Sequence, residues 1–169
     1  MKLADIWSKF GKPRKKERRH DSVVLLLREP YTFTSERLIS ACEKAWNHPF
    51  NSGEDSSHFL HGDGAITLIK CGSSLINLLQ SASPYTPPDT ERILQSAGEE
   101  ERLAWHRHTA WTALDHLNDY DFTPNESYAT LARLALELLD ANCLAIYIPA
   151  LRKIMLNNGN AQAVLRKLT

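Results

Sequence analysis

Histidine is the residue type in this sequence that is both suited to chemistry and clustered along the chain. Six side chains form two groups, with His58, His61 and Asp63 in the first and His106, His108 and His116 in the second. Imidazole nitrogens and carboxylates are ligands that zinc and similar divalent metals accept. Residues at even spacing share one face of a strand, so a strand over the second group would bring its imidazoles together. No spacing is diagnostic of a metal site, and we expect no bound metal and no other cofactor.

A nucleophilic site is the second chemical alternative. It would combine a nucleophile (Cys71, Ser73 or Ser74), a base (His61 or His108) and a carboxylate that orients the base (Asp63 or Asp115). Cys71 ends an apolar run, which favours a buried thiol of low reactivity. Motifs for phosphate-binding loops, dinucleotide-binding loops, nucleophile elbows and zinc-binding helices are absent from the sequence. The sequence therefore favours a protein that is not an enzyme.

Aromatic residues accompany the second histidine group. Trp105 and Trp111 lie within it, and Tyr85, Tyr120 and Phe122 lie nearby. Such side chains can form a ligand pocket or a partner surface, although we expect about half of them to pack in the core. We place the candidate surface for a protein or small ligand at seven residues: His61, Asp63, Trp105, His106, His108, Trp111 and His116.

The first 20 residues form a basic arm with an apolar stripe. Residues 1–20 carry eight Lys or Arg and two Asp or Glu, a net charge of +6, so residues 21–169 carry a net charge of −6. The stripe recurs at helical spacing and consists of Leu3, Ile6, Trp7 and Phe10. The basic contacts expected of the arm are Arg14, Lys15, Lys16, Arg18 and Arg19. This pattern suits an anionic membrane surface, a partner protein or RNA, or a solubilising tail. The acidic remainder argues against nucleic-acid binding by the body.

The elements that would position these residues follow from local signals. Two apolar runs, at Val23–Leu27 and Leu144–Ile148, predict buried strands that are neighbours in the sheet. Thr34 or Ser35 begins one predicted helix, and a capping box at Thr123 begins another, which extends from Pro124 to about Asp140. The sequence around Gly62-Asp63-Gly64 predicts a hairpin.

Other segments give weaker signals. Residues 74–80 are interpreted as a strand, and a polar helix is expected from Asp89 or Thr90 to about Arg102. Trp105 to Asn118 suits either a helix or a strand, and one or two short helices are expected to finish the chain around residues 157–159. Together the elements predict an α+β fold with a mixed, mostly antiparallel sheet and helices packed mainly on one face. We expect an arm over residues 1–20 and a single domain over residues 21–169.

The pattern over about residues 22–150 resembles a bacterial family of small domains of unknown function. The resemblance rests on the Leu25-Leu26-Leu27 strand, the capped helix, the Gly-Asp-Gly hairpin, a strand leading to Ser83-Pro84-Tyr85, the block from Trp105 to Trp111 and the last helix and strand. It implies an α+β sheet domain and a strand from Trp105 to Leu117. It transfers no catalytic residue.

These observations lead to a functional expectation and two alternatives. Three cysteines without a CxxC pair suit a reducing compartment, and no apolar run approaches the ~18 residues of a membrane span. We expect a non-enzymatic bacterial module that binds a protein or small ligand in the cytoplasm, placed by its arm, with the inner membrane face as one location. The alternatives are a metal-dependent hydrolase that uses the histidines, and an immunity-type or regulatory partner of a basic protein.

Overall fold

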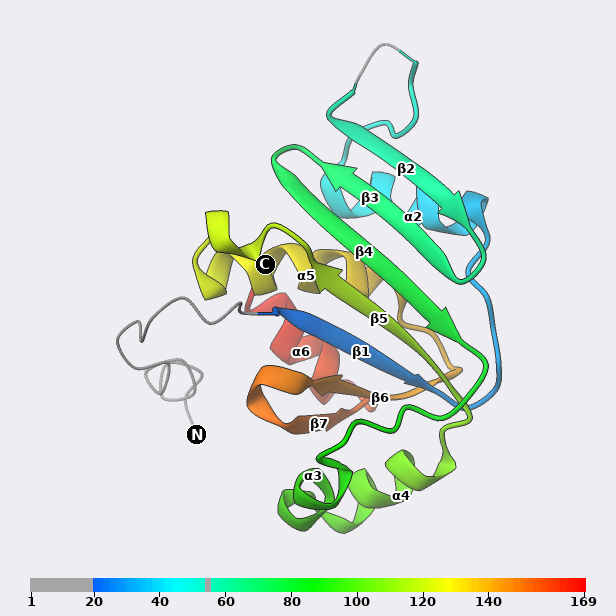
Figure 1. The fold of residues 1–169 in the computed structure, drawn as a ribbon, viewed down its shortest axis with the longest axis vertical. Coiled ribbons are helices and arrows are strands. Elements are labelled where there is room, and N and C mark those ends of the chain that lie inside the picture. Colours follow the sequence, from blue (N-terminus) through cyan, green and yellow to red (C-terminus); the bar gives the residue numbers. More distant parts are fainter. Residues whose placement is uncertain (1–19, 54–55) are drawn as a thin grey trace.

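The chain folds around one antiparallel sheet of seven strands (Figure 1). The computed structural model describes residues 20–53 and 56–169. The strands are β1 (Ser22–Leu27), β2 (His58–Asp63), β3 (Ile66–Cys71), β4 (Ser74–Ser81), β5 (Ala110–His116), β6 (Cys143–Ile148) and β7 (Lys153–Leu156). Their order across the sheet is β2-β3-β4-β5-β1-β6-β7. The described helices are α2 (Ser35–Trp46), α3 (Thr90–Ser96), α4 (Glu99–Arg107), α5 (Pro124–Leu138) and α6 (Asn160–Arg166). The predicted α+β class is confirmed.

The larger hydrophobic core lies on the sheet face that packs against α2, α5 and α6. Strand residues of one parity point into it, among them Leu25, Ile69 and Leu114. The predicted capping box begins α5, where the Thr123 hydroxyl accepts from the Glu126 amide at 3.3 Å and the Thr123 amide donates to the Glu126 carboxylate at 2.8 Å. Val23–Leu27 and Leu144–Ile148 form the buried neighbours β1 and β6, as predicted.

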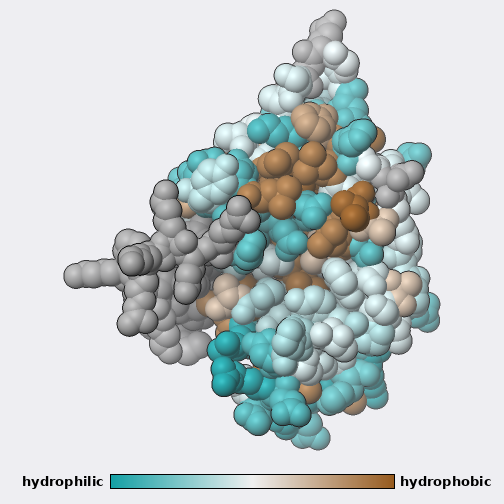
Figure 2. All heavy atoms as spheres, in the orientation of Figure 1, coloured by the Kyte–Doolittle hydropathy of each residue, from teal (hydrophilic) through white to brown (hydrophobic). Residues whose placement is uncertain are grey.

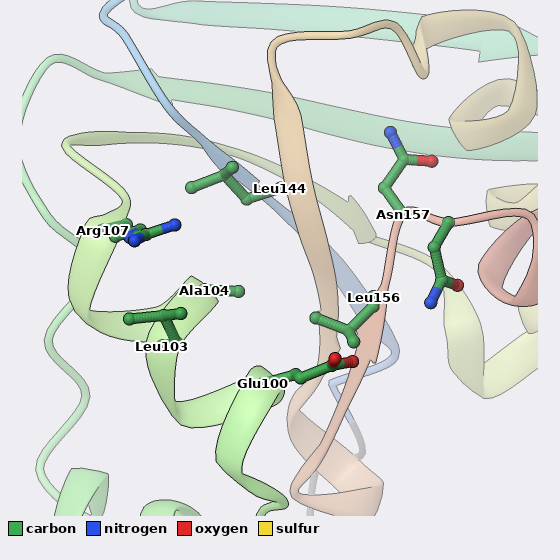
Figure 3. Close-up of a pocket in the computed structure, with 8 residues that line it drawn as sticks. Glu100, Leu103, Ala104, Arg107, Leu144, Leu156 and Asn157 are labelled. Atoms are coloured by element: carbon green, nitrogen blue, oxygen red, sulfur yellow. The ribbon is translucent and has the colours of Figure 1, made fainter.

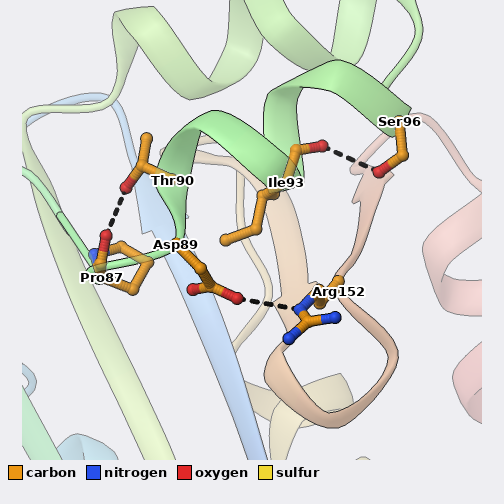
Figure 4. A network of polar contacts seen from close by, with 6 residues as sticks. All are labelled: Pro87, Asp89, Thr90, Ile93, Ser96 and Arg152. Atoms are coloured by element: carbon orange, nitrogen blue, oxygen red, sulfur yellow. Dashed lines mark hydrogen bonds and ion pairs between the residues drawn. The ribbon is translucent and has the colours of Figure 1, made fainter.

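The opposite sheet face carries α3 and α4, which cover only part of it. A second core joins Val24, Leu26 and Tyr147 of the sheet to Ile93 of α3 and Trp105 of α4. At the start of α3 an ion pair of 2.9 Å joins Asp89 Oδ2 to Arg152 Nε in the turn after β6 (Figure 4). Figure 1 shows α3 and α4 beside β6 and β7, and neither reaches β2 or β3. Three of the five described helices therefore share one face.

Two glycine turns build the β2-β3-β4 meander. Each loop has two residues, and its first residue, Gly64 or Gly72, has a φ near +60°. Type II′ hairpin turns require a positive φ at this position. Gly62 within β2 also has a φ of 122°, and a Cβ there would lie 2.5 Å from the Ile66 carbonyl oxygen. The predicted hairpin is confirmed, but Asp63 is the last residue of β2 and not a turn residue.

The outer edge of β2 is closed by a loop residue, Asn51. Its backbone amide donates to the His58 carbonyl at 3.1 Å, and its side-chain Oδ1 accepts from the Leu60 amide at 2.8 Å. Asn51 has a φ of 56°, a left-handed conformation that asparagine tolerates better than most residues. Two of the outward-facing backbone groups of this edge strand are therefore already paired.

Several predicted boundaries are wrong. The expected single helix from residue 89 or 90 is divided at Ala97-Gly98 into α3 and α4. The strand implied over Trp105–Leu117 begins only at Ala110, because Trp105 and His106 belong to the last turn of α4. One element, β7, was not predicted, because its four residues carry too short a pattern. The apolar arm residues Leu3, Ile6, Trp7 and Phe10 and the basic arm residues Arg14, Lys15, Lys16, Arg18 and Arg19 lie outside the described residues.

Candidate functional site

The histidines named from the sequence lie in different places. His61 is exposed on β2, and His106 is exposed on α4. His108 and His116 are buried on opposite faces of the sheet, the first beside Trp105 and the second against Ser127 of α5. Within residues 20–53 and 56–169, no group of three or more His, Cys, Asp or Glu side chains is arranged to hold a metal. The histidine-based hydrolase therefore has no assembled ligand set in this part of the chain.

His108 joins the C-terminus of α4 to the loop before α3. Its Nε2 accepts a hydrogen bond of 2.7 Å from the Tyr85 amide, so Nδ1 carries the proton and donates to the Trp105 carbonyl. Burial lowers the pKa of His108, and its hydrogen bonds with Trp105 and Tyr85 offset part of that effect. A neutral imidazole with both nitrogens engaged is a structural bridge and has no atom left for a ligand.

Three of the seven proposed site residues meet in one aromatic cluster. The Tyr85 ring lies between Trp105, Trp111 and Tyr147, with centroid distances of 6.2, 5.4 and 5.9 Å. Trp105, which contacts His108, and Tyr147 are buried, and Trp111 is half-buried at the margin of α3 and α4. This cluster closes the second core rather than lining a cavity. The sequence prediction included Trp105 and Trp111 but missed Tyr147.

Of the three candidate nucleophiles, Cys71 and Ser74 are buried, whereas Ser73 is exposed in the turn between β3 and β4. Burial raises the pKa of Cys71 to about 12, and its Sγ donates to the Ser74 carbonyl. Ser127 Oγ lies 2.6 Å from His116 Nδ1, but Ser127 is 0% exposed. A thiol that stays protonated and a hydroxyl that no solvent touches cannot attack an external ligand. The prediction that Cys71 is buried is confirmed.

A shallow hollow of about 430 Å³ lies between α4 and the β6-β7 hairpin (Figure 3). Its floor is apolar, and Glu100 and Arg107 of α4 flank it. The lining residues are Glu100, Leu103, Ala104, Arg107, Leu144, Leu156, Asn157 and Asn158. None of the seven residues named from the sequence lines this hollow. The Asn157 amide group is already bonded to the Asp140 and Cys143 carbonyls at 2.9 Å.

The part of the sheet beyond α3 and α4 presents a broad apolar surface, here named the open face. Strand register places its outward residues in rows. One row is Phe59, Lys70, Leu75 and Leu117, and the next is His61, Leu68, Asn77 and Asp115. A third contains Ile66 and Leu79 and continues into Ala113, which is buried in the second core. Ile66 is 60% and Leu117 46% exposed, while Phe59, Leu68, Leu75 and Leu79 are half-buried. Figure 2 shows apolar side chains gathered over these strands.

The charges on the open face are few and of both signs. Lys70 and Asp115 are the charged residues whose exposure is described there, Asp63 pairs with Ile66 in the third row, and His61 and Asn77 are the other polar residues. A surface that binds phosphates carries clustered lysine and arginine, which this face lacks. Contiguous exposed apolar residues with a polar rim are typical of protein-binding surfaces. The open face is therefore the best candidate site in the described structure.

Sequence reasoning missed most of the open face, although a signal was present. β3 and β4 read Ile-Thr-Leu-Ile-Lys-Cys and Ser-Leu-Ile-Asn-Leu-Leu, with apolar residues at both parities. A strand covered on one side only should alternate apolar and polar residues. The apolar residues on the outward parity, Ile66, Leu68, Leu75 and Leu79, give the pattern expected of strands that are covered on both faces. Of the predicted residues, His61, Asp63 and Trp111 belong to the strands of this region.

No helix in the described structure is long and apolar enough to cross a membrane. Comparisons with family models, with curated proteins and with solved structures found no match to this chain. The resemblance to a family of small bacterial domains therefore stays a prediction.

Proposed function

We propose that the domain is a protein-binding module and that the open face is its binding surface. The observation that carries the proposal is the apolar row structure of β2, β3 and β4 on the side that α3 and α4 leave bare. Burial of such side chains against a partner is favourable in proportion to the apolar area removed from water. A sheet surface that extends over β2, β3 and β4 suits a protein better than a small ligand, because small ligands are usually bound in concave pockets.

The residues of the open face indicate which groups a complementary partner would present. The partner presents apolar side chains to Leu68, Leu75 and Leu79, with a carboxylate placed for Lys70 and a basic group for Asp115. Because Lys70 and Asp115 carry opposite charges, they favour one orientation of the bound partner over others. The three buried thiols suit a reducing compartment such as the cytoplasm. No catalytic step is required for this function.

Site-specific photocrosslinking in the native cells tests the proposal. A photoreactive phenylalanine analogue replaces Asn77, in the middle of the open face, and a matched chain carries it at Arg166, an exposed residue of α6 on the other side of the sheet. We expect a discrete protein adduct from position 77 and none from position 166. Ile66→Asp should remove that adduct, because a carboxylate cannot be buried unpaired.

Two results would contradict the proposal. Equal adducts from both positions would show non-specific proximity, and no adduct from position 77 would show that the open face has no protein partner in those cells. An adduct of twice the chain's mass would support the proposal and identify the partner as a second copy.

A further inference from the structure

We propose that the apolar stripe of the arm, Leu3, Ile6, Trp7 and Phe10, packs on the open face of its own chain and competes there with the partner. The docking itself concerns one chain and can be tested alone. Its regulatory consequence rests on the proposed function, because it requires a partner for the same surface. The occupant is therefore a segment of this protein, and its release would expose the binding site.

The stripe needs a surface to be stable. Its four residues occupy positions i, i+3, i+4 and i+7, which form one face of a helix. An isolated helix of about ten residues is marginal in water, because nucleation is unfavourable and few hydrogen bonds repay it. Packing of the apolar face supplies most of the stability of such helices in proteins. On the open face the described residues leave Ile66 and Leu117 largely exposed, and Phe59, Leu68 and Leu75 only half-buried.

The described chain starts close to the open face. Ser22 at the start of β1 pairs with Asp115, and Asp115 pairs with Asn77 in the middle row. Two strand spacings, about 10 Å, therefore separate the start of β1 from the centre of the open face. The nine residues 11–19 can span up to about 30 Å when extended. A ten-residue helix is about 15 Å long, comparable with the width of three or four strands.

Charge favours the same placement. The Asp21 amide donates to Asp119 at 3.1 Å, which sets the turn at residues 119–121 beside the start of the described chain. Asp121 in this turn is exposed, and Asp115 lies at the near margin of the open face. The basic residues that follow the stripe would cross this acidic margin, and the body as a whole has a charge of −6. Attraction of this kind is screened over about 8 Å at physiological ionic strength. Apolar packing therefore carries the docking, and charge guides it.

Disulfide trapping tests the docking without removing any apolar contact. Ala4 flanks the stripe, and Asn77 lies in the middle row of the open face. The double variant Ala4→Cys with Asn77→Cys therefore places one thiol on the arm and one on the open face of the same chain. The matched control pairs Ala4→Cys with Arg166→Cys on α6. Cys42, Cys71 and Cys143 are buried, and burial raises each pKa to about 12, so they give little background.

We expect the 4–77 disulfide to form several times faster than the 4–166 disulfide, at a rate independent of protein concentration. Ile6→Asp with Phe10→Asp should reduce the 4–77 rate to that of the control, and 1 M salt should leave most of the difference intact. Equal rates for the two pairs would overturn the inference. Equal rates together with co-sedimentation on vesicles that contain phosphatidylserine would also overturn it and assign the stripe to a membrane.

Deletion of residues 1–19 tests the regulation. The truncated chain should melt within a few degrees of the full chain, which serves as the folding control, and should give several times more photoadduct from position 77. A trapped 4–77 disulfide with unchanged adduct yield after deletion would show docking without competition and would overturn the regulatory part. No trapped disulfide together with a position-77 adduct would leave the proposed function standing and reject this inference alone.

Discussion

The sheet face that carries α3 and α4 has two halves. Both halves are apolar, but the two helices cover only one of them. A single row of cross-strand neighbours passes from Ile66 through Leu79 and Ala113 to Val24 and Tyr147. Ile66 at one end is 60% exposed, whereas Val24 and Tyr147 under α3 and α4 are almost completely buried. The exposure of these apolar residues is therefore decided by the helices that reach them.

This difference separates a surface that stabilises the fold from the surface that we propose binds a partner. The covered half gains its free energy within the chain, through Ile93 and Trp105 above it. The open half carries comparable side chains without a described partner, so their burial is available for association. A change in the covered half should act on stability, and a change in the open half should act on binding.

The largest effect is expected for Leu26→Ala. Leu26 is fully buried under α3 and α4, and its truncation leaves a cavity, so we expect a loss of about 2–5 kcal/mol in the free energy of unfolding. Leu68→Ala on the open face is the matched control and should cost less than half as much, because Leu68 is only half-buried. Urea unfolding of both variants measures the difference. Equal losses would show that the two halves are covered alike.

An intermediate effect is expected from acidification at His108. Burial lowers its folded-state pKa below 6.5, so the unfolded chain takes up this proton at a higher pH than the folded chain. The stabilising contribution is therefore complete above pH 6.5 and is lost as the pH falls toward the folded-state pKa. Urea unfolding from pH 7.5 to 5 should show a decline that is weaker in His108→Gln. An identical decline in both chains would exclude His108 as the cause.

The smallest effect on stability is expected for Ile66→Asn. Its side chain is largely exposed, so the free energy of unfolding should change by no more than about 0.5 kcal/mol. The same replacement at Ile69, three residues along β3 on the opposite face and 0% exposed, should destabilise the fold strongly. Thermal unfolding of the two variants compares them. A strongly destabilised Ile66→Asn would remove the distinction between the halves.

The elements with local signals could be predicted from the sequence. β1 and β6 are apolar runs, and α5 begins with a capping box. All three elements can therefore be predicted from neighbouring residues alone. The boundary between α4 and β5 could not be predicted in this way. At this boundary His108 accepts a hydrogen bond from the Tyr85 amide, which joins residues 23 positions apart.

The candidate site was harder to predict, because it is defined by a helix pair that ends short of β2 and β3. Residues on strands can be assigned to a face by parity, but parity does not tell which face a distant helix will cover. The histidines illustrate the opposite case. His108 and His116 are eight positions apart and would share one face if a single strand covered both, but the chain turns from helix to strand between them.

The bonds from Asn51 to β2 have a consequence for assembly. Sheets polymerise when an unpaired edge strand recruits the edge of another molecule and backbone hydrogen bonds continue from copy to copy. With the His58 carbonyl and the Leu60 amide already occupied, the first half of this edge offers fewer groups to a second strand. Contacts made through the neighbouring apolar surface would then be face-to-face and finite. The protein can thus expose an apolar sheet face with a reduced risk of forming fibrils through the β2 edge.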